Sequence, residues 1–279
     1  METTRQPRVA CAIAICLAAG LMVAVVVGTS LLSLRPRTTD FPAAEPAPPP
    51  APWPGRKPSA AAVEDARYIK ARRSMVEEDL RGRNITDTKV LEVMGRIPRH
   101  RFVPEDFRDL AYADRPVPIG HGQTISQPYI VALMTQAARP HPESRALDIG
   151  TGSGYQAAVL AELCKYVSSI EILEPLAASA RERLAALGYK NITVRCGDGY
   201  QGWPEKAPFD IIIVAAAPDH VPQPLVEQLA PGGRLVLPVG NFFQELLLIE
   251  KQKDGSTRRE SLAPVRFVPL RGEAEKGGR

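Results

Sequence analysis

The chain has 279 residues, of which 44% are hydrophobic and 24% are charged, and its formal net charge is +4 at pH 7. This length and composition are those of an ordinary globular protein with one or two domains. The small positive charge is not gathered into a run of like charges, which argues against a nucleic-acid-binding protein. The four cysteines have no C-x-x-C spacing and the four histidines are dispersed, so we expect neither a disulfide framework nor a bound metal.

The amino-terminal part of the sequence divides into two zones. Val9–Leu34 contains no charged residue and exceeds the about 20 residues that a membrane-spanning helix needs. A cleaved signal peptide usually has a shorter apolar region of about 7–15 residues, so we expect residues 1–35 to be an uncleaved membrane anchor. The small residues Thr29 and Ser30 leave a cleaved signal as the alternative. Residues 36–60 are rich in proline and alanine and are expected to form a semi-rigid linker.

The remaining sequence has the pattern of one folded domain over residues 61–272, and the charged residues 273–279 are expected to be a flexible tail. Two helices are predicted first, over Val63–Gly82 and Thr86–Met94, each from the spacing of its apolar residues. The residues Asn84–Asp87 offer a cap for the second helix.

Beyond Glu143, short apolar runs alternate with helical patterns. Helical patterns separate the first five of the six strand candidates, which are Ala146–Ile149, Val167–Ile172, Ile192–Arg195, Phe209–Val214, Arg234–Leu237 and Glu245–Glu250. This alternation predicts an α/β fold with a mainly parallel sheet and helices on both faces.

The sequence DIGTGSG at Asp148–Gly154 lies between a predicted strand and a helix that we expect over Tyr155–Leu163. A dinucleotide-binding loop would need glycine where Tyr155 stands, and an acid before the first glycine would repel a pyrophosphate. The same acid would attract the sulfonium and ammonium groups of S-adenosylmethionine, by about 4 kcal/mol for a 4 Å pair at an effective dielectric of about 20. We therefore expect this cofactor to be bound by Asp148, Gly150, Thr151, Gly152, Ser153 and Gly154.

Two further acids follow the next two strands at the same edge of the predicted sheet. Glu171 ends the second strand, where an acid receives ribose hydroxyls in open α/β nucleotide sites, and Glu174 is the alternative for this role. Asp198 and Gly199 follow the third strand, where the acid could accept a hydrogen bond from an adenine amino group. The alternative for each acid is a solvated carboxylate in a turn.

Six segments resemble the protein-L-isoaspartate O-methyltransferase family. They are HGQTISQPY at His121–Tyr129, LDIGTGSGYQ at Leu147–Gln156, GDGYQGW at Gly197–Trp203, AAP at Ala216–Pro218, PGGRLVLPVG at Pro231–Gly240 and VRFVPL at Val265–Leu270. The first and last segments are specific to the family, whereas the glycine loop is common to many methyltransferases. The resemblance extends over about residues 65–271.

The resemblance implies a Rossmann-like S-adenosylmethionine-dependent methyltransferase sheet with an amino-terminal helical cap. It also implies methyl transfer to the free α-carboxylate of L-isoaspartyl residues, and more weakly of D-aspartyl residues, in damaged proteins. Ser126 corresponds to the family's active-site serine, and we expect it to orient the acceptor carboxylate. Substrate binding is expected at Thr124, Ile125, Ser126, Val239 and Arg266.

Two alternatives remain for residues of His121–Tyr129, which we call the acceptor segment. Ser126 precedes Pro128 and a predicted helix over Ile130–Ala137, so its side chain could instead cap that helix. His121 is interpreted as a loop residue and not as a catalytic one.

The resemblance leaves two other functions open, a methyltransferase for a small molecule or RNA and a membrane-tethered binding protein with an inactive site. Arginines lie on both sides of the apolar segment, so charge gives almost no preference for its orientation. S-adenosylmethionine is a cytosolic metabolite, so we expect the catalytic domain on the cytoplasmic side, tethered to the membrane through residues 9–34. The sequence does not determine the oligomeric state, and a monomer is favoured. An exported or periplasmic domain is the alternative.

Overall fold

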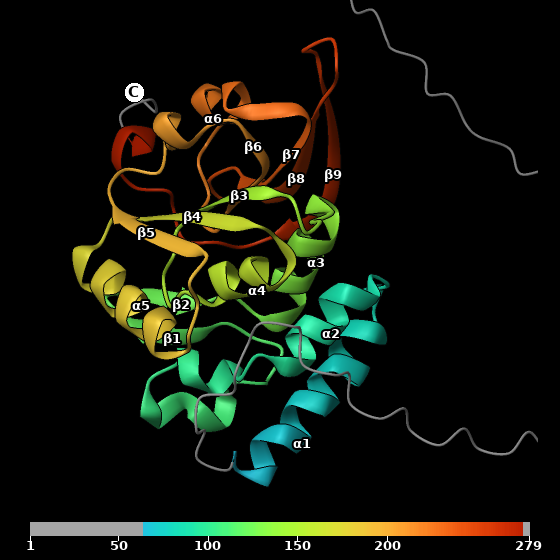
Figure 1. The fold of residues 1–279 in the computed structure, drawn as a ribbon, viewed down its shortest axis with the longest axis vertical. Coiled ribbons are helices and arrows are strands. Elements are labelled where there is room, and N and C mark those ends of the chain that lie inside the picture. Colours follow the sequence, from blue (N-terminus) through green and yellow to red (C-terminus); the bar gives the residue numbers. More distant parts are fainter. Residues whose placement is uncertain (1–63, 276–279) are drawn as a thin grey trace, which may run out of the picture. The chain divides into compact units, whose positions relative to one another are not determined.

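The computed structural model describes residues 64–275 (Figure 1). The predicted anchor over residues 1–35, the predicted linker over 36–60 and residues 276–279 of the predicted tail lie outside the described residues. Within residues 64–275, none of the helices has both the length and the apolar character that crossing a membrane requires.

The centre of the domain is a seven-stranded sheet with the strand order β5-β4-β3-β6-β7-β8-β9. The first five strands in this order are parallel, β8 is antiparallel to β7, and β9 is antiparallel to β8. All six predicted strands are present, as β3 Arg145–Ile149, β4 Tyr166–Glu171, β5 Ile192–Cys196, β6 Phe209–Val214, β7 Leu229–Val239 and β8 Gln244–Lys251. The predicted mainly parallel sheet is therefore confirmed.

Helices cover both faces of the sheet, as predicted, but unequally (Figure 1). One face packs against α3 Pro128–Ala138, α4 Tyr155–Leu163 and α5 Glu174–Ala186, and the other packs against the short α6 Gln223–Glu227. A helix expected between the third and fourth strands is replaced, in this described stretch, by the single 3-10 turn η4 Pro204–Lys206. Three glycines and two prolines between Cys196 and Phe209 explain this difference, because both residue types disfavour helices.

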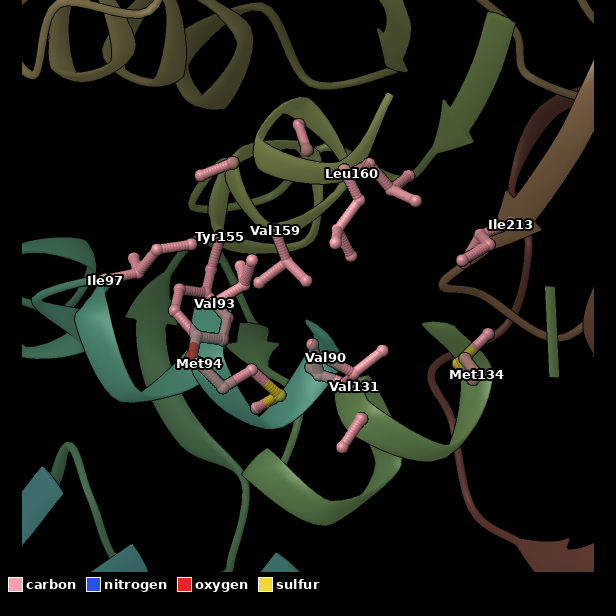
Figure 2. Packing of buried hydrophobic residues seen from close by; sticks show 14 of the residues in the cluster. Val90, Val93, Met94, Ile97, Val131, Met134, Tyr155, Val159, Leu160 and Ile213 are labelled. Carbon is pink, nitrogen blue, oxygen red and sulfur yellow. The ribbon is translucent and has the colours of Figure 1, made fainter. Parts of the chain in front are cut away.

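The predicted helical cap precedes the sheet. It consists of α1 Ala66–Ser74, the π-helical η1 Met75–Arg81, α2 Thr88–Arg96, and the 3-10 turns η2 Arg99–Phe102 and η3 Glu105–Leu110. Asp87 caps α2 by accepting hydrogen bonds from the backbone N–H groups of Lys89 (2.9 Å) and Val90 (3.2 Å), which confirms the predicted cap. Figure 2 shows apolar side chains of α2, α3, α4 and β6 in one core, so the helical cap packs against α3 and α4.

Besides the 3-10 turns η2, η3 and η4, three elements were not predicted from the sequence. The first is a hairpin of β1 Val117–Gly120 and β2 Gln123–Ile125, and the second is the edge strand β9 Thr257–Val265. The third is the 3-10 turn η5 Gly272–Glu275, in which Ala274 is buried. Ordered structure therefore continues beyond residue 272, where the flexible tail was expected to begin.

Candidate active site

The glycine loop lies where the strand order of the sheet reverses. β3 has β4 on one side and β6 on the other, and the chain leaves β3 at Ile149 and enters α4 at Tyr155. Gly150, Gly152 and Gly154 have φ values of 86°, 52° and 87°, a left-handed conformation that favours glycine. In open α/β sheets, ligands bind in the crevice beyond the carboxyl ends of the strands at such a reversal.

A pocket opens at this point and occupies about 900 Å³ including its mouth. It brings together nine of the predicted site residues, namely Thr124, Ile125, Ser126, Gly150, Thr151, Gly152, Ser153, Glu171 and Gly199. Five others do not line it, namely Asp148, Gly154, Asp198, Val239 and Arg266. The predicted cofactor loop and the predicted acceptor segment thus share one pocket.

Glu171 is the acid that faces this pocket. It is 5% exposed, and its carboxylate accepts hydrogen bonds from the backbone N–H groups of Gly152 (2.8 Å) and Leu173 (3.0 Å). A carboxylate has about four lone-pair sites, so each oxygen can still accept a hydrogen bond from a ligand hydroxyl. The alternative acid, Glu174, is outside the pocket lining and forms an ion pair with Arg181 (2.5 Å).

The acceptor segment reaches the pocket through the β1–β2 hairpin. Its turn has three consecutive left-handed residues, Gly120 (φ 92°), His121 (φ 53°) and Gly122 (φ 70°), and His121 is exposed there as expected of a loop residue. A methyl group added to Gly152 would lie 3.3 Å from Ile119 Cδ1, so the hairpin packs directly on the glycine loop. This contact places Ser126, just beyond the hairpin, beside the cofactor loop.

Ser126 does not cap the helix that follows it. α3 begins at Pro128 with Gln127 as its N-cap, and the backbone N–H of Tyr129 donates to Asp114 Oδ1 at 2.9 Å. An acid from an earlier segment therefore supplies the cap, and Ser126 is one of the residues that line the pocket. The acceptor-binding interpretation of Ser126 stays a prediction.

Known proteins resemble the whole domain. The family profile described as protein-L-isoaspartate(D-aspartate) O-methyltransferase matches residues 70–275. A protein-L-isoaspartate O-methyltransferase of Opitutus terrae is 59% identical over 76% of this chain and 91% of its own length. Protein-L-isoaspartate O-methyltransferase 2 of Syntrophobacter fumaroxidans is 54% identical over the same shares of the two chains.

Two solved structures support the same assignment. A structure described as protein-L-isoaspartate O-methyltransferase has a TM-score of 0.67 and 28% identity, covering 73% of this chain and 67% of the other. A Plasmodium falciparum protein of this description, solved with S-adenosyl-L-homocysteine, has a TM-score of 0.63 and 30% identity. The match covers 72% of this chain and 98% of the other. The chain belongs to the protein-L-isoaspartate(D-aspartate) O-methyltransferase family.

In this O-methyltransferase, Asp148 lies beneath the glycine loop. Its side chain is fully buried, and Oδ2 accepts a hydrogen bond from Ser169 Oγ at 2.7 Å. Burial raises the pKa of the carboxyl, the Ser169 hydrogen bond lowers it, and the nearby charge of Glu171 raises it, with a net value of about 7. Asp148 does not line the pocket, and its predicted contact with the cofactor stays a prediction.

In this methyltransferase, both carboxylate oxygens of Asp198 accept hydrogen bonds from the main chain. Its Oδ1 accepts from the backbone N–H of Tyr200 (2.8 Å), and its Oδ2 accepts from the backbone N–H of Glu273 (2.7 Å). The carboxylate thus ties the carboxyl-terminal turn η5 to the segment that follows β5, and its neighbour Gly199 provides the contact with the pocket.

Arg99 is a residue of the site that sequence reasoning missed. Its guanidinium is fully buried and donates to the backbone carbonyls of Ala111 (2.7 Å) and Ser126 (2.6 Å). Its Cζ lies 4.6 Å from the centroid of the Tyr155 ring, and Tyr155 lines the pocket. Arg99 thereby joins the helical cap, the acceptor segment and the first residue of α4, and only the three-dimensional structure brings these parts together.

Another part of the pocket wall of this methyltransferase was also not predicted. It includes Ala215, Ala216 and the segment Val268–Arg271. The backbone N–H of Leu270 donates to the carbonyl of Ala217 at 2.8 Å, and the backbone N–H of Ala217 donates to that of Val268 at 2.8 Å. The family-like runs at 216–218 and 265–270 were a signal for this wall. Residues 64–275 contain no group of histidine, cysteine or acidic side chains arranged to hold a metal.

Proposed function

We propose that this protein transfers a methyl group from S-adenosylmethionine to the free α-carboxylate of L-isoaspartyl residues, and of D-aspartyl residues, in damaged proteins. The resulting ester closes spontaneously to a succinimide, whose hydrolysis returns part of the product to normal aspartyl residues. One observation carries this proposal beyond family membership: the glycine loop and the Thr124–Ser126 segment line the same pocket.

The cofactor fits the residues at the loop end of this pocket. Gly150 and Gly152 let the backbone approach a ligand closely, and the start of α4 directs helix-terminal N–H groups toward it. Glu171 retains acceptor capacity for ribose hydroxyls, and Gly199 completes the wall after β5. When bound, the cofactor supplies an activated methyl group.

The acceptor needs positioning more than activation. A carboxylate with a pKa of about 4 is already ionised at neutral pH, so the protein needs no general base for it. Ser126 is proposed to donate a hydrogen bond from its hydroxyl to one carboxylate oxygen; Ser126 and Thr124 both line the pocket. Alignment in a pocket that excludes water is the catalytic contribution that these residues can make.

A comparison of two peptides tests the proposal. Purified protein should methylate an isoaspartyl peptide and leave the matching aspartyl peptide unmodified, as measured by transfer of a radioactive methyl group. Equal rates on both peptides, or transfer to neither, would contradict the assigned acceptor. Transfer to a small molecule or to RNA in the same assay would support the alternative function.

We also propose that residues 61–272 form a monomeric catalytic domain, tethered by residues 9–34 through the linker 36–60 to the cytoplasmic face of the membrane. The uncharged run Val9–Leu34 and the cytosolic supply of S-adenosylmethionine support this arrangement. A reporter fused to the carboxyl terminus should be active only on the cytoplasmic side. Reporter activity on the outer side would support the exported alternative.

A further inference from the structure

Two adjacent phenylalanines in the turn between β7 and β8 are almost fully exposed. Phe242 is 99% exposed and Phe243 is 94% exposed, whereas the other exposed large apolar side chains of residues 64–275, Ile69 and Ile172, are 41% and 37% exposed. Single apolar residues on a surface are ordinary. Aromatic residues are enriched at interfaces, so an adjacent, fully exposed pair indicates a surface that a partner covers.

The turn that carries this pair is braced on both sides. On the side of β7, the backbone N–H of Gly240 donates to the carbonyl of Pro218 at 2.9 Å. On the side of β8, Gln244 accepts from the backbone N–H of Phe267 (2.6 Å) and donates to its carbonyl (3.1 Å). The pair is therefore presented on a fixed turn, which reduces the conformational entropy that a partner must remove.

Both braces are continuous with the wall of the active-site pocket. Pro218 follows the lining residues Ala215 and Ala216, and Phe267 directly precedes the lining segment Val268–Arg271. The turn also lies between two positions where the family resemblance predicts substrate binding, Val239 at the end of β7 and Arg266 after β9. The turn that carries the exposed pair is thus linked through Pro218 and Phe267 to the wall of the pocket.

We propose that Phe242 and Phe243 bind apolar side chains of the substrate polypeptide adjacent to the isoaspartyl residue. This inference rests on the proposed function, because an isoaspartyl residue inside a protein continues into chain on both sides of the pocket. Aromatic faces provide a large apolar contact without requiring a particular sequence. The surface therefore favours isoaspartyl sites in exposed apolar segments, such as those of unfolded proteins, over sites flanked by polar residues.

The test uses two isoaspartyl hexapeptides that differ only in their flanking residues, leucine in one and serine in the other. We expect the full-length wild-type protein to have a KM about tenfold lower for the leucine peptide. The double variant Phe242→Ser/Phe243→Ser should lose this preference through a higher KM for the leucine peptide, with kcat and the KM for S-adenosylmethionine unchanged. The control Ile69→Ser, which also removes an exposed apolar side chain, should retain the preference.

Other outcomes would overturn the inference. Equal KM values of the wild-type protein for the two peptides would reject it while leaving the proposed function intact, whereas methylation of neither peptide would reject both. A double variant that keeps the preference would also reject the inference. If that variant no longer self-associates in gel filtration, the pair contacts a second copy of the chain.

Discussion

The buried carboxyl of Asp148 makes the stability of the domain depend on pH. Its pKa rises from an ordinary value of 3.8 to about 7, chiefly because burial disfavours the charged form. Between these two values, the folded state keeps the proton and the unfolded state releases it. The contribution of this group to the unfolding free energy is therefore fully present below about pH 4. It falls as the pH rises and is lost as the pH passes about 7.

The size of this effect follows from the shift in pKa. Each pKa unit corresponds to about 1.4 kcal/mol, so a shift of about 3 units corresponds to about 4 kcal/mol of unfolding free energy between pH 4 and pH 8. Asparagine has nearly the same shape and no proton to release. The variant Asp148→Asn should therefore lack this part of the pH dependence, and its stability relative to the wild-type protein should rise with pH.

Urea unfolding of the two proteins at several pH values, without cofactor, measures the difference. The variant Ser169→Ala is a matched control, because it removes the hydrogen bond that lowers the pKa of Asp148 and should extend the loss of stability to higher pH. Parallel pH profiles for the wild-type protein and Asp148→Asn would refute the reasoning, since they would show that this carboxyl titrates alike in the folded and unfolded states.

Three further predictions concern the pocket. Ser126→Ala should lower kcat/KM for an isoaspartyl peptide about 10- to 100-fold, the effect of one hydrogen bond to a charged group, and an unchanged value would remove Ser126 from the site. Arg99→Met should lower the same quantity about tenfold with little change in S-adenosylhomocysteine affinity. The control Arg72→Met removes a buried guanidinium that donates to the Gly95 carbonyl, and it should lower stability without changing the KM for the peptide. Equal losses of kcat/KM in the two variants would show that Arg99 has only a structural role. Glu171→Gln should weaken S-adenosylhomocysteine binding about tenfold in calorimetry, and unchanged binding would contradict its ribose role.

The central sheet could be predicted from the sequence because its strands are buried on both faces and appear as continuous apolar runs. β9 could not, because Thr257–Val265 is an exposed edge strand with several charged residues. The hairpin of β1 and β2 could not be predicted either, since strands of four and three residues have too few side chains to establish an alternating pattern. In both cases the strand forms because it pairs with a neighbouring segment, and the local sequence gives little indication of that pairing.

The cofactor loop was predictable because its three glycines lie within five residues of the sequence and its conformation depends on local backbone angles. The side-chain direction of Asp148 required the register of the sheet. Leu147 and Ile149 pack on one face, so Asp148 points to the opposite face with Ala146, where Ser169 of β4 is its direct neighbour. The register of the sheet therefore directs the Asp148 carboxyl toward Ser169, which the motif alone could not show.

The geometry also explains why the helical cap, which precedes the methyltransferase sheet in the chain, belongs to the catalytic machinery. Arg99 from the cap binds the carbonyl of Ser126 and packs against Tyr155, and Ile119 packs against Gly152. The predicted donor and acceptor subsites are consequently connected by one set of contacts. Because methyl transfer depends on alignment and not on acid–base chemistry, a change in these contacts should lower kcat for the acceptor before it lowers cofactor affinity. That separation distinguishes a positioning defect from loss of the cofactor site.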